Sequence, residues 1–371
     1  MRPAIKPGLV VVWRDRDTLQ IGIDPRRAVA LTGMGRAAAL IGLLDGSREH
    51  SQVLAAAEQL GIPRQQADQV IGLLAAAGAV QDFPAAELRA LPDGPRGRLA
   101  RELATASLAH GHADGGARVL ARRQGASVRV YGAGPVGSEI ASLLTASGVG
   151  RVVCTGLLGP AIPRPAVPGR PRSPRHGGTA PATRRGTPSA TRGSPPPATR
   201  DGSPPATRGG SSSPVPPALR QRRGGAGPRP DLAVLTDGYP AELPAQLMAA
   251  RVPHLAASAR EAIGVVGPLV LPGESACLSC VELARSDRDP AWPFILAQLA
   301  GQAAQPVACA ATLVTAVAAQ AVSQVLSCLD LAQPAQAVIN ATLELVSPGW
   351  QWRRRSWPKH DHCRCSTRLA T

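Results

Sequence analysis

The sequence predicts an α/β protein that combines a Rossmann-like fold with a small N-terminal β3α3 segment. Two observations carry this prediction. A strand pattern over 127–131 runs directly into the closely spaced glycines 132, 134 and 137 and then into a helix ending near residue 147. Ahead of it, three short strand patterns and three helix patterns fill residues 9–78, an order typical of a winged-helix-like module.

The N-terminal elements follow from local signals. Alternating apolar runs predict strands over 9–13, 19–23 and 28–31. Helices are predicted over 36–44, over 51–60 with Ser51 as N-cap, and from just after Pro63 to Gly78. After these helices, the short apolar pair Ala79-Val80 is expected to be extended. A helical connector, interrupted near 111–116, is then expected to lead to residue 126.

After the glycine loop, the sequence predicts a strand over 151–154 and a strand over 231–237 that ends on Asp237. A helix over 241–251, a strand over 253–257 and a strand pair over 264–271 follow. The longest apolar region, 307–329, contains Gln320, Ser323 and Gln324 and is rich in Ala. These features favour a buried helix over a membrane span.

The charge is distributed unevenly. The chain has 371 residues and a net charge of +16, and residues 156–230 hold 13 Arg, 18 of the 37 Pro and one acid, Asp201. That segment therefore accounts for +12, and the folded remainder is nearly neutral. An Ala-Thr-Arg triplet recurs there every eight residues from Ala182 to Ala206. Such a repeat buries no apolar face, which predicts a disordered insertion, although repeat expansion or a locally shifted reading frame also produces this pattern.

Specific nucleic-acid binding is not expected. The repeats carry Arg without interleaved aromatics, which gives only salt-sensitive attraction to phosphate. The third predicted helix of the N-terminal segment starts with one Arg and one Asp, Arg64 and Asp68, rather than a basic recognition face. A transcription regulator is therefore the least favoured of the three functions considered for this chain. No signal peptide or membrane span is predicted, and the cysteine usage favours the cytoplasm.

The glycine loop indicates a phosphate site. Gly132, Gly134 and Gly137 allow a tight turn and a close backbone approach, and the following helix N-terminus offers free N–H groups. A tight turn that binds nothing is the alternative. The second strand ends on Cys154 and Thr155, where an acid would hold the ribose hydroxyls, so bound NAD is not expected.

Four cysteines in two close pairs suit a tetrahedral zinc ion: Cys277 with Cys280, and Cys363 with Cys365. Closing the loop between the pairs costs about 4 kcal/mol. A structural zinc site contributes about 10–16 kcal/mol, so the metal could hold the C-terminal tail to the body. A site that uses His362 in place of one cysteine, and unliganded thiols, are the alternatives. For Cys154, Cys309 and Cys328 the simplest interpretation is a small buried apolar side chain.

These motifs together resemble the ThiF/MoeB-type adenylyltransferases, relatives of the ubiquitin-activating enzymes. The resemblance covers about half of the chain, and the first 80 or so residues resemble the PqqD-like modules that bind leader peptides of modified peptides. The matching stretches are VYGAGPVGSEIASLLTASGVGRV, DLAVLTDGYP, GPLVLPGESACLSC, VACAATLVTAVAAQAVSQVL and HCRC.

The resemblance implies ATP-dependent adenylation of a carboxyl terminus on a peptide or small protein, and commonly a homodimer. By position, Gly132, Gly134 and Gly137 match the nucleotide loop, and Asp237 matches the acid associated with magnesium and phosphate. The four paired cysteines match the zinc ligands. Cys309 stands where some members place an acyl-accepting cysteine.

Several departures from the family's pattern predict impaired catalysis. Gly238 replaces the Asn that usually follows the strand-end acid, and no Lys occurs between Lys6 and Lys359. The octapeptide repeats occupy the segment that normally carries the catalytic Arg and Lys. Losing such charge-stabilising groups removes several kcal/mol of transition-state stabilisation. The alternative function is a non-catalytic adaptor that binds a leader peptide and docks on a partner modification enzyme.

We therefore expect five segments along the chain. They are a winged-helix or PqqD-like module (1–83), a helical connector (84–126), the first part of the ThiF-type domain (127–155), the insertion (156–230) and the remainder with a zinc-binding tail (231–371).

Overall fold

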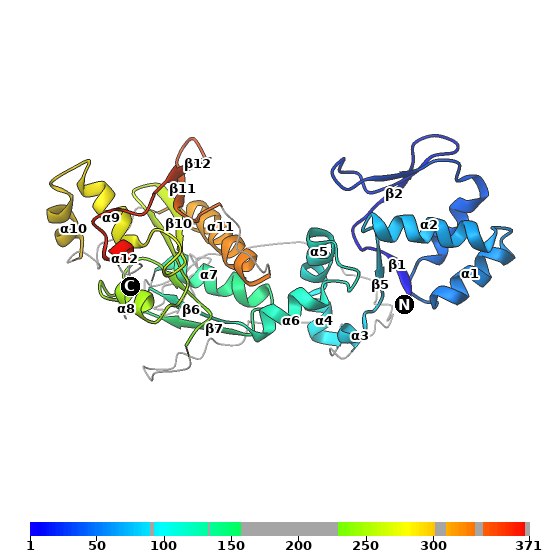
Figure 1. Ribbon diagram of the computed structural model, residues 1–371, viewed down its shortest axis with the longest axis horizontal. Helices are drawn as coiled ribbons and strands as arrows, with labels where there is room; N and C mark the ends of the chain where they lie inside the picture. Colours follow the sequence, from blue (N-terminus) through cyan, green and yellow to red (C-terminus); the bar gives the residue numbers. More distant parts are fainter. Residues whose placement is uncertain (90–92, 133, 157–228, 301–308, 331–336, 368–371) are drawn as a thin grey trace, which may run out of the picture. The chain divides into compact units, whose positions relative to one another are not determined.

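The computed structural model describes residues 1–89, 93–132, 134–156, 229–300, 309–330 and 337–367. Nearly all of the predicted insertion therefore lies outside the described residues. The elements fall into a seven-stranded mixed sheet with flanking helices and two small sheets near the N-terminus (Figure 1). This mixed α/β arrangement confirms the predicted fold class.

The first 82 residues form two small antiparallel sheets with three helices. The elements are β1 (Pro3–Ile5), β2 (Val11–Trp13), β3 (Leu19–Ile21), β4 (Val29–Leu31), η1 (Gly35–Leu43), α1 (His50–Gln59), α2 (Arg64–Ala76) and β5 (Val80–Asp82). β2, β3 and β4 form one sheet in that order, and β1 pairs with β5. The β1–β5 pair joins the two ends of the segment, a contact that the sequence did not reveal.

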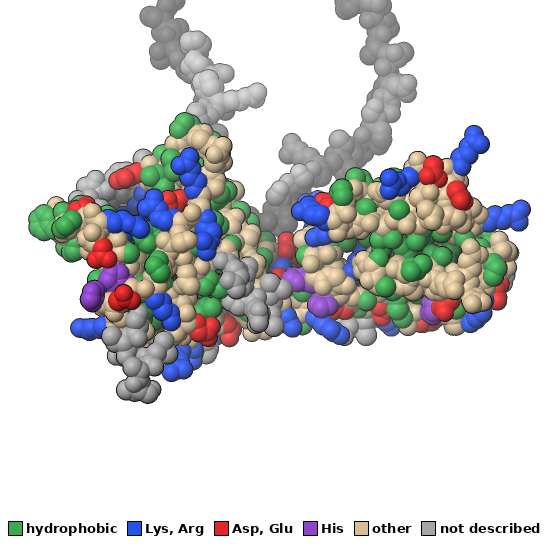
Figure 2. Space-filling view, turned by 45° about the horizontal axis from the view of Figure 1, so that its top comes forward, with side chains coloured by type: hydrophobic (Ala, Val, Ile, Leu, Met, Phe, Trp, Pro, Cys, Tyr) green, Lys and Arg blue, Asp and Glu red, His purple; other side chains and the backbone are tan. Residues whose placement is uncertain are grey.

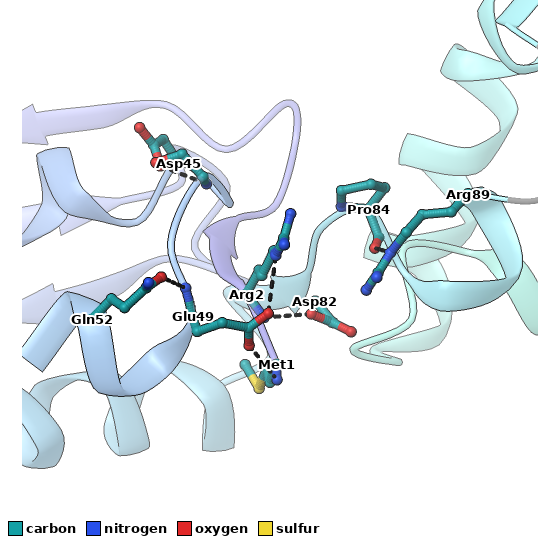
Figure 3. A network of polar contacts seen from close by, with 9 residues as sticks. Met1, Arg2, Asp45, Glu49, Gln52, Asp82, Pro84 and Arg89 are labelled. Carbon is teal, nitrogen blue, oxygen red and sulfur yellow. Dashed lines mark hydrogen bonds and ion pairs between the residues drawn. The ribbon is translucent and has the colours of Figure 1, made fainter.

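Helix α1 starts at His50, one residue earlier than expected. Its N-cap is Glu49, whose carboxylate pairs with a backbone N–H inside the first turn while Gln52 Oε1 accepts the Glu49 N–H at 2.9 Å. The expectation of Ser51 as N-cap was wrong because this capping box satisfies the free N–H groups first. The Glu49 carboxylate also holds the chain start, since Arg2 Nε and the Met1 amino group lie 3.0 and 3.2 Å from its oxygens (Figure 3).

The connector consists of α3 (Ala86–Arg89), α4 (Asp93–Arg98), α5 (Ala100–His110) and α6 (Ala117–Gly125). The predicted break near 111–116 is confirmed, because Gly111 ends α5 and Gly116 precedes α6, both with positive φ. A buried ionic cluster ties α6 to the sheet-packing helix α11. Arg123 Nε and Nη2 donate to the two carboxylate oxygens of Asp330 at 2.8 and 2.6 Å.

The large sheet has the strand order β12-β11-β10-β9-β8-β6-β7. Its strands are β6 (Ser127–Tyr131), β7 (Arg151–Thr155), β8 (Leu232–Leu235), β9 (His254–Arg260), β10 (Ile263–Val270), β11 (Ala341–Val346) and β12 (Gln351–Ser356). β7, β6, β8 and β9 run parallel, whereas β9 to β12 pair antiparallel. Helices α7 (Pro135–Ala146), α8 (Leu243–Ala249), α9 (Leu278–Ser286), α10 (Trp292–Ala300), α11 (Ala311–Asp330) and α12 (Arg364–Thr367) complete the fold.

Helix α11 is long and apolar enough to cross a membrane by composition, but its packing makes it a core helix. Leu313, Val317 and Ala321 are buried in one core cluster with Val128 of β6 and Ile140 of α7. The sequence-based expectation of a buried helix is therefore confirmed for its described residues.

The structure adds elements to the C-terminal half that the sequence did not predict. Residues 263–270 form one strand rather than a strand pair, and β9 and β11 pair on its two sides. The hairpin of β11 and β12 and helices α9 and α10 were missed as well. Successive arginines in β12 obscure the apolar alternation by which a strand is recognised.

Candidate functional site

The glycine loop and Asp237 lie together at the carboxyl edge of the parallel strands. β6 and β8 are neighbours, and each continues into this edge. Alternate residues of β8 face different helices: Leu232 and Val234 pack with α7 and α11, whereas Ala233 and Leu235 pack with α8. Helices thus cover both faces, and the β6–β8 boundary is the switch point at which such sheets bind ligands.

The three loop glycines have different roles. Gly132 has a φ of +127°, and a Cβ there would lie 2.1 Å from Thr236 Oγ1. A Cβ on Gly137 would lie 2.9 Å from the same oxygen. Gly134, the N-cap of α7, faces open space. Packing against β8 therefore explains Gly132 and Gly137 without a ligand, and Gly134 alone leaves room for one.

Thr236 fastens the ends of β6 and β8. Its backbone N–H and its hydroxyl both donate to the Tyr131 carbonyl, at 2.7 and 3.0 Å. Thr236 is 1% exposed. Because this contact holds the Thr236 side chain against the loop, there is no room for a Cβ at Gly132 or Gly137. Sequence reasoning missed this role of Thr236, because Thr236 and the glycines are far apart along the chain.

Asp237 is paired within the protein. Arg260, the last residue of β9, donates from Nε to Asp237 Oδ1 at 2.7 Å. Burial raises the pKa of the Asp237 carboxyl, and the positive charge of Arg260 opposes that shift. β9 runs parallel to β8 and extends past it, which brings its terminal arginine to this edge. The sequence analysis did not single out Arg260.

Cys309 lies just before α11, on the edge of the main core cluster. Burial raises the pKa of its thiol, and the negative charge of Asp237 raises it further. The structure thus brings Cys309 within electrostatic reach of Asp237 but disfavours the thiolate that a nucleophile requires.

Both lysines are engaged away from this edge. The Lys6 ammonium donates to the Ser107 carbonyl at 2.8 Å, and burial lowers its pKa. The Lys359 ammonium donates to the Gly273 carbonyl at 3.0 Å. Among the described residues, Arg260 is the cation that pairs with Asp237.

The four predicted ligand cysteines form a separate cluster. Cys277 is the N-cap of α9, Cys280 lies in its first turn, and Cys363 and Cys365 belong to the tail around α12. The sulfurs all lie within 4.8 Å of one another, with Cys277 Sγ 3.8 Å from Cys280 Sγ and 3.5 Å from Cys363 Sγ. Four thiols in this arrangement could hold a metal ion.

His362 is not a member of this cluster. Its backbone N–H donates to His360 Nδ1 at 3.2 Å, and His360 Nε2 lies 2.8 Å from Asp287 Oδ2 beyond the end of α9. His360 thus helps to hold the tail against the end of α9. Burial raises the pKa of the Cys365 thiol to about 11. Burial acts in the same direction at Cys280, but backbone hydrogen bonds from His360 and Cys277 and the thiols of Cys365 and Cys363 together outweigh it, so the pKa of Cys280 is lowered.

No protein-family model matches this chain, and no curated protein matches it. Solved structures do match its fold. A heterocyclase in complex with substrate and cofactor has a TM-score of 0.60 at 12% identity, over 99% of this chain and 39% of that one. The heterocyclase TruD has a TM-score of 0.58 at 13% identity, over 98% of this chain and 42% of its own.

A third similar structure, E. coli MccB with AMPCPP and MccA, has a TM-score of 0.60 at 12% identity and is covered over 99% of both chains. The chain therefore spans about two fifths of the two heterocyclases and nearly all of MccB. At these identities the likeness establishes the fold.

Proposed function

We propose that this protein is the peptide-recognition component of a peptide-modifying system. In this proposal, its N-terminal segment captures a substrate peptide and its ThiF-type part is a scaffold for a partner enzyme. The observation that carries the proposal is the exposed apolar edge strand β2.

β2 is an outer strand of its sheet, with β3 on one side and no described strand on the other. Val11, Val12 and Trp13 are 38%, 38% and 52% exposed, although all three are strongly apolar. Such an edge offers both unpaired backbone groups and apolar contacts. An extended peptide that adds a strand there would use both.

The comparisons support a peptide as the ligand. The similar structures include a heterocyclase with its substrate and MccB with MccA. The two heterocyclases also carry more than half of their length outside the match.

The paired charges at the sheet edge favour an adaptor over an enzyme. Asp237 is already neutralised by Arg260, and both lysines are engaged elsewhere. Stabilising the charge that develops at an α-phosphate requires free cations or a metal held by an acid. At this edge, the described acid already shares one of its oxygens with Arg260.

Adenylation of a peptide carboxyl terminus is the second candidate. Asp237 and Gly134 lie at the ligand-binding switch point, and MccB matches this chain over its whole length. ATP would then contact the loop at Gly134, and Asp237 would hold magnesium after release from Arg260. ATP–pyrophosphate exchange with a candidate peptide, lost in Asp237→Asn, would establish this activity.

The cysteine cluster fits zinc. Zinc–sulfur bonds of about 2.3 Å in a tetrahedron place the sulfurs about 3.8 Å apart. Three of the sulfur–sulfur separations are 3.3, 3.5 and 3.8 Å, all four sulfurs lie within 4.8 Å of one another, and the cluster is largely buried. We propose that zinc, held by Cys277, Cys280, Cys363 and Cys365, supplies folding energy by joining the C-terminal tail to α9.

We keep the five-segment division, a cytoplasmic location and a homodimer as proposals. A cluster of reduced thiols suits a reducing compartment. Sedimentation of the full-length protein would test the dimer.

Peptide capture is tested by titrating the full-length protein with short precursor peptides encoded beside its gene. We expect Val12→Glu to weaken binding at least tenfold, because it places a charge on the apolar edge. The matched control is Leu60→Glu, at the exposed apolar C-cap of α1. Equal affinity for the two variants, or no binding at high micromolar concentration, would refute the proposal.

A further inference from the structure

Strand β12 forms one edge of the large sheet. It pairs with β11 on one side and with no described strand on the other (Figure 1). All six residues, Gln351–Ser356, are exposed. Such a row of unpaired backbone groups can pair with another chain.

Three successive arginines give this edge a positive charge on both faces, because neighbouring residues of a strand point to opposite sides. Arg355 Nε pairs with Glu344 Oε1 at 3.1 Å, and Arg354 Nε donates to the Ala337 carbonyl at 3.0 Å. Arg353 has no ion-pair or hydrogen-bond partner among the residues that the structure describes. Lys and Arg side chains gather on this part of the molecule in Figure 2.

Exposed apolar side chains adjoin the arginines. Trp350 and Trp352 are 45% and 37% exposed, and Val346 on the adjacent β11 and Ile263 on β10 beyond it are exposed as well. Trp350 has a φ of +49°, which bulky residues rarely adopt. Arginines that only protect a strand edge from pairing do not require two exposed indoles beside them. Edge protection therefore does not explain the exposure of Trp350 and Trp352.

The charge limits which chain can pair with β12. A second copy pairing antiparallel through β12 would set arginines against arginines, which is unfavourable. The Arg-rich segment 156–230 of the same chain is excluded for the same reason. Nucleic acid would satisfy the arginines but would leave the backbone edge unpaired.

We propose that β12 is a docking edge for an acidic, extended segment of a partner protein, which adds to the sheet as a further strand. Acidic side chains on one face of the added strand would meet Arg353 and Arg355, and apolar side chains on the other face would lie beside Trp352. This surface goes beyond the proposed capture of a substrate at β2 and does not depend on it.

The test uses the full-length protein and a labelled eight-residue peptide that alternates Val and Glu, with a Val–Lys peptide as the charge control. We expect the Val–Glu peptide to bind with an affinity that falls with salt, and to slow amide exchange within β12. Arg353→Glu should weaken binding at least tenfold. Arg101→Glu, at an exposed position on α5, should leave it unchanged.

Equal binding of the two peptides, or an undiminished affinity of Arg353→Glu, would overturn the proposal. Tighter binding of a single-stranded oligonucleotide that displaces the peptide would assign the surface to nucleic acid instead. Self-association of Arg353→Ala, with no peptide binding by the parent protein, would show that the arginines only protect the edge. Thermal unfolding of each variant confirms that it remains folded.

Discussion

Arg260 Nε lies 2.7 Å from Asp237 Oδ1, joining the ends of β9 and β8 at the edge where the glycine loop also lies. The acid expected to hold magnesium is therefore held by an arginine of the same chain. A metal ion held through the same oxygen would have to displace that arginine, which supports the proposed adaptor role.

Replacing Arg260 should make stability depend more strongly on pH. The pKa of Asp237 is raised above 3.8 in the folded protein by burial, so its ionisation opposes folding as pH rises through that raised value. Arg260→Ala removes the opposing charge and raises the pKa further. We expect a loss of about 1 kcal/mol at pH 7 and less at pH 4. Urea unfolding at both pH values checks this, and equal losses would contradict it.

Gly132→Ala should destabilise the protein by about 3 kcal/mol or more, because the new Cβ would overlap Thr236 Oγ1 at a positive φ. Gly134→Ala should leave stability nearly unchanged, since nothing lies within 4 Å of its Cβ position. Chemical denaturation compares the two. A loss of nucleotide affinity in folded Gly134→Ala would favour the adenylation candidate.

The purified protein should contain one zinc ion per chain. Cys277→Ser should lose the metal and expose the tail to proteolysis, whereas Cys328→Ser, outside the cluster, should retain it. Acidification should release zinc because the ligands must be thiolates. Elemental analysis and limited proteolysis provide the readouts, and full metal content in the Cys277/Cys280 double substitution would refute the site.

Arg123→Met should destabilise the protein by about 3–5 kcal/mol, because it leaves the buried Asp330 carboxylate without its main partner. The double variant Arg123→Met/Asp330→Leu should recover most of that loss, since two apolar side chains replace a buried ion pair. Urea unfolding of the two single variants and the double variant measures the coupling. Additive losses would show that the pair contributes nothing.

Local signals predicted several elements well. The glycine loop, the adjoining strand and helix, and the two cysteine pairs depend on residues close in sequence, and the structure contains all of them. The capping of α1 and the strand β12 were missed, because Glu49 competes with Ser51 and successive arginines mask alternation.

In the candidate site too, residues marked by a local motif were predicted and residues brought in by tertiary contacts were not. Asp237 was identified from its place at a strand end, but Arg260 is 23 residues away and has no motif of its own. Only the parallel pairing of β8 and β9 brings them together. Likewise, Thr236 meets Gly132 across 104 residues of chain, much of it the insertion.

The sequence by itself determined the α/β class, the glycine loop, the strand-end acid and the paired cysteines, because each is encoded by neighbouring residues. Tertiary structure decided what those residues face: a Thr236 hydroxyl behind the glycines, an arginine on the acid and four thiols in one cluster. The physical reason is that charge pairing and close packing act between atoms in space, and strand order sets which distant residues become neighbours.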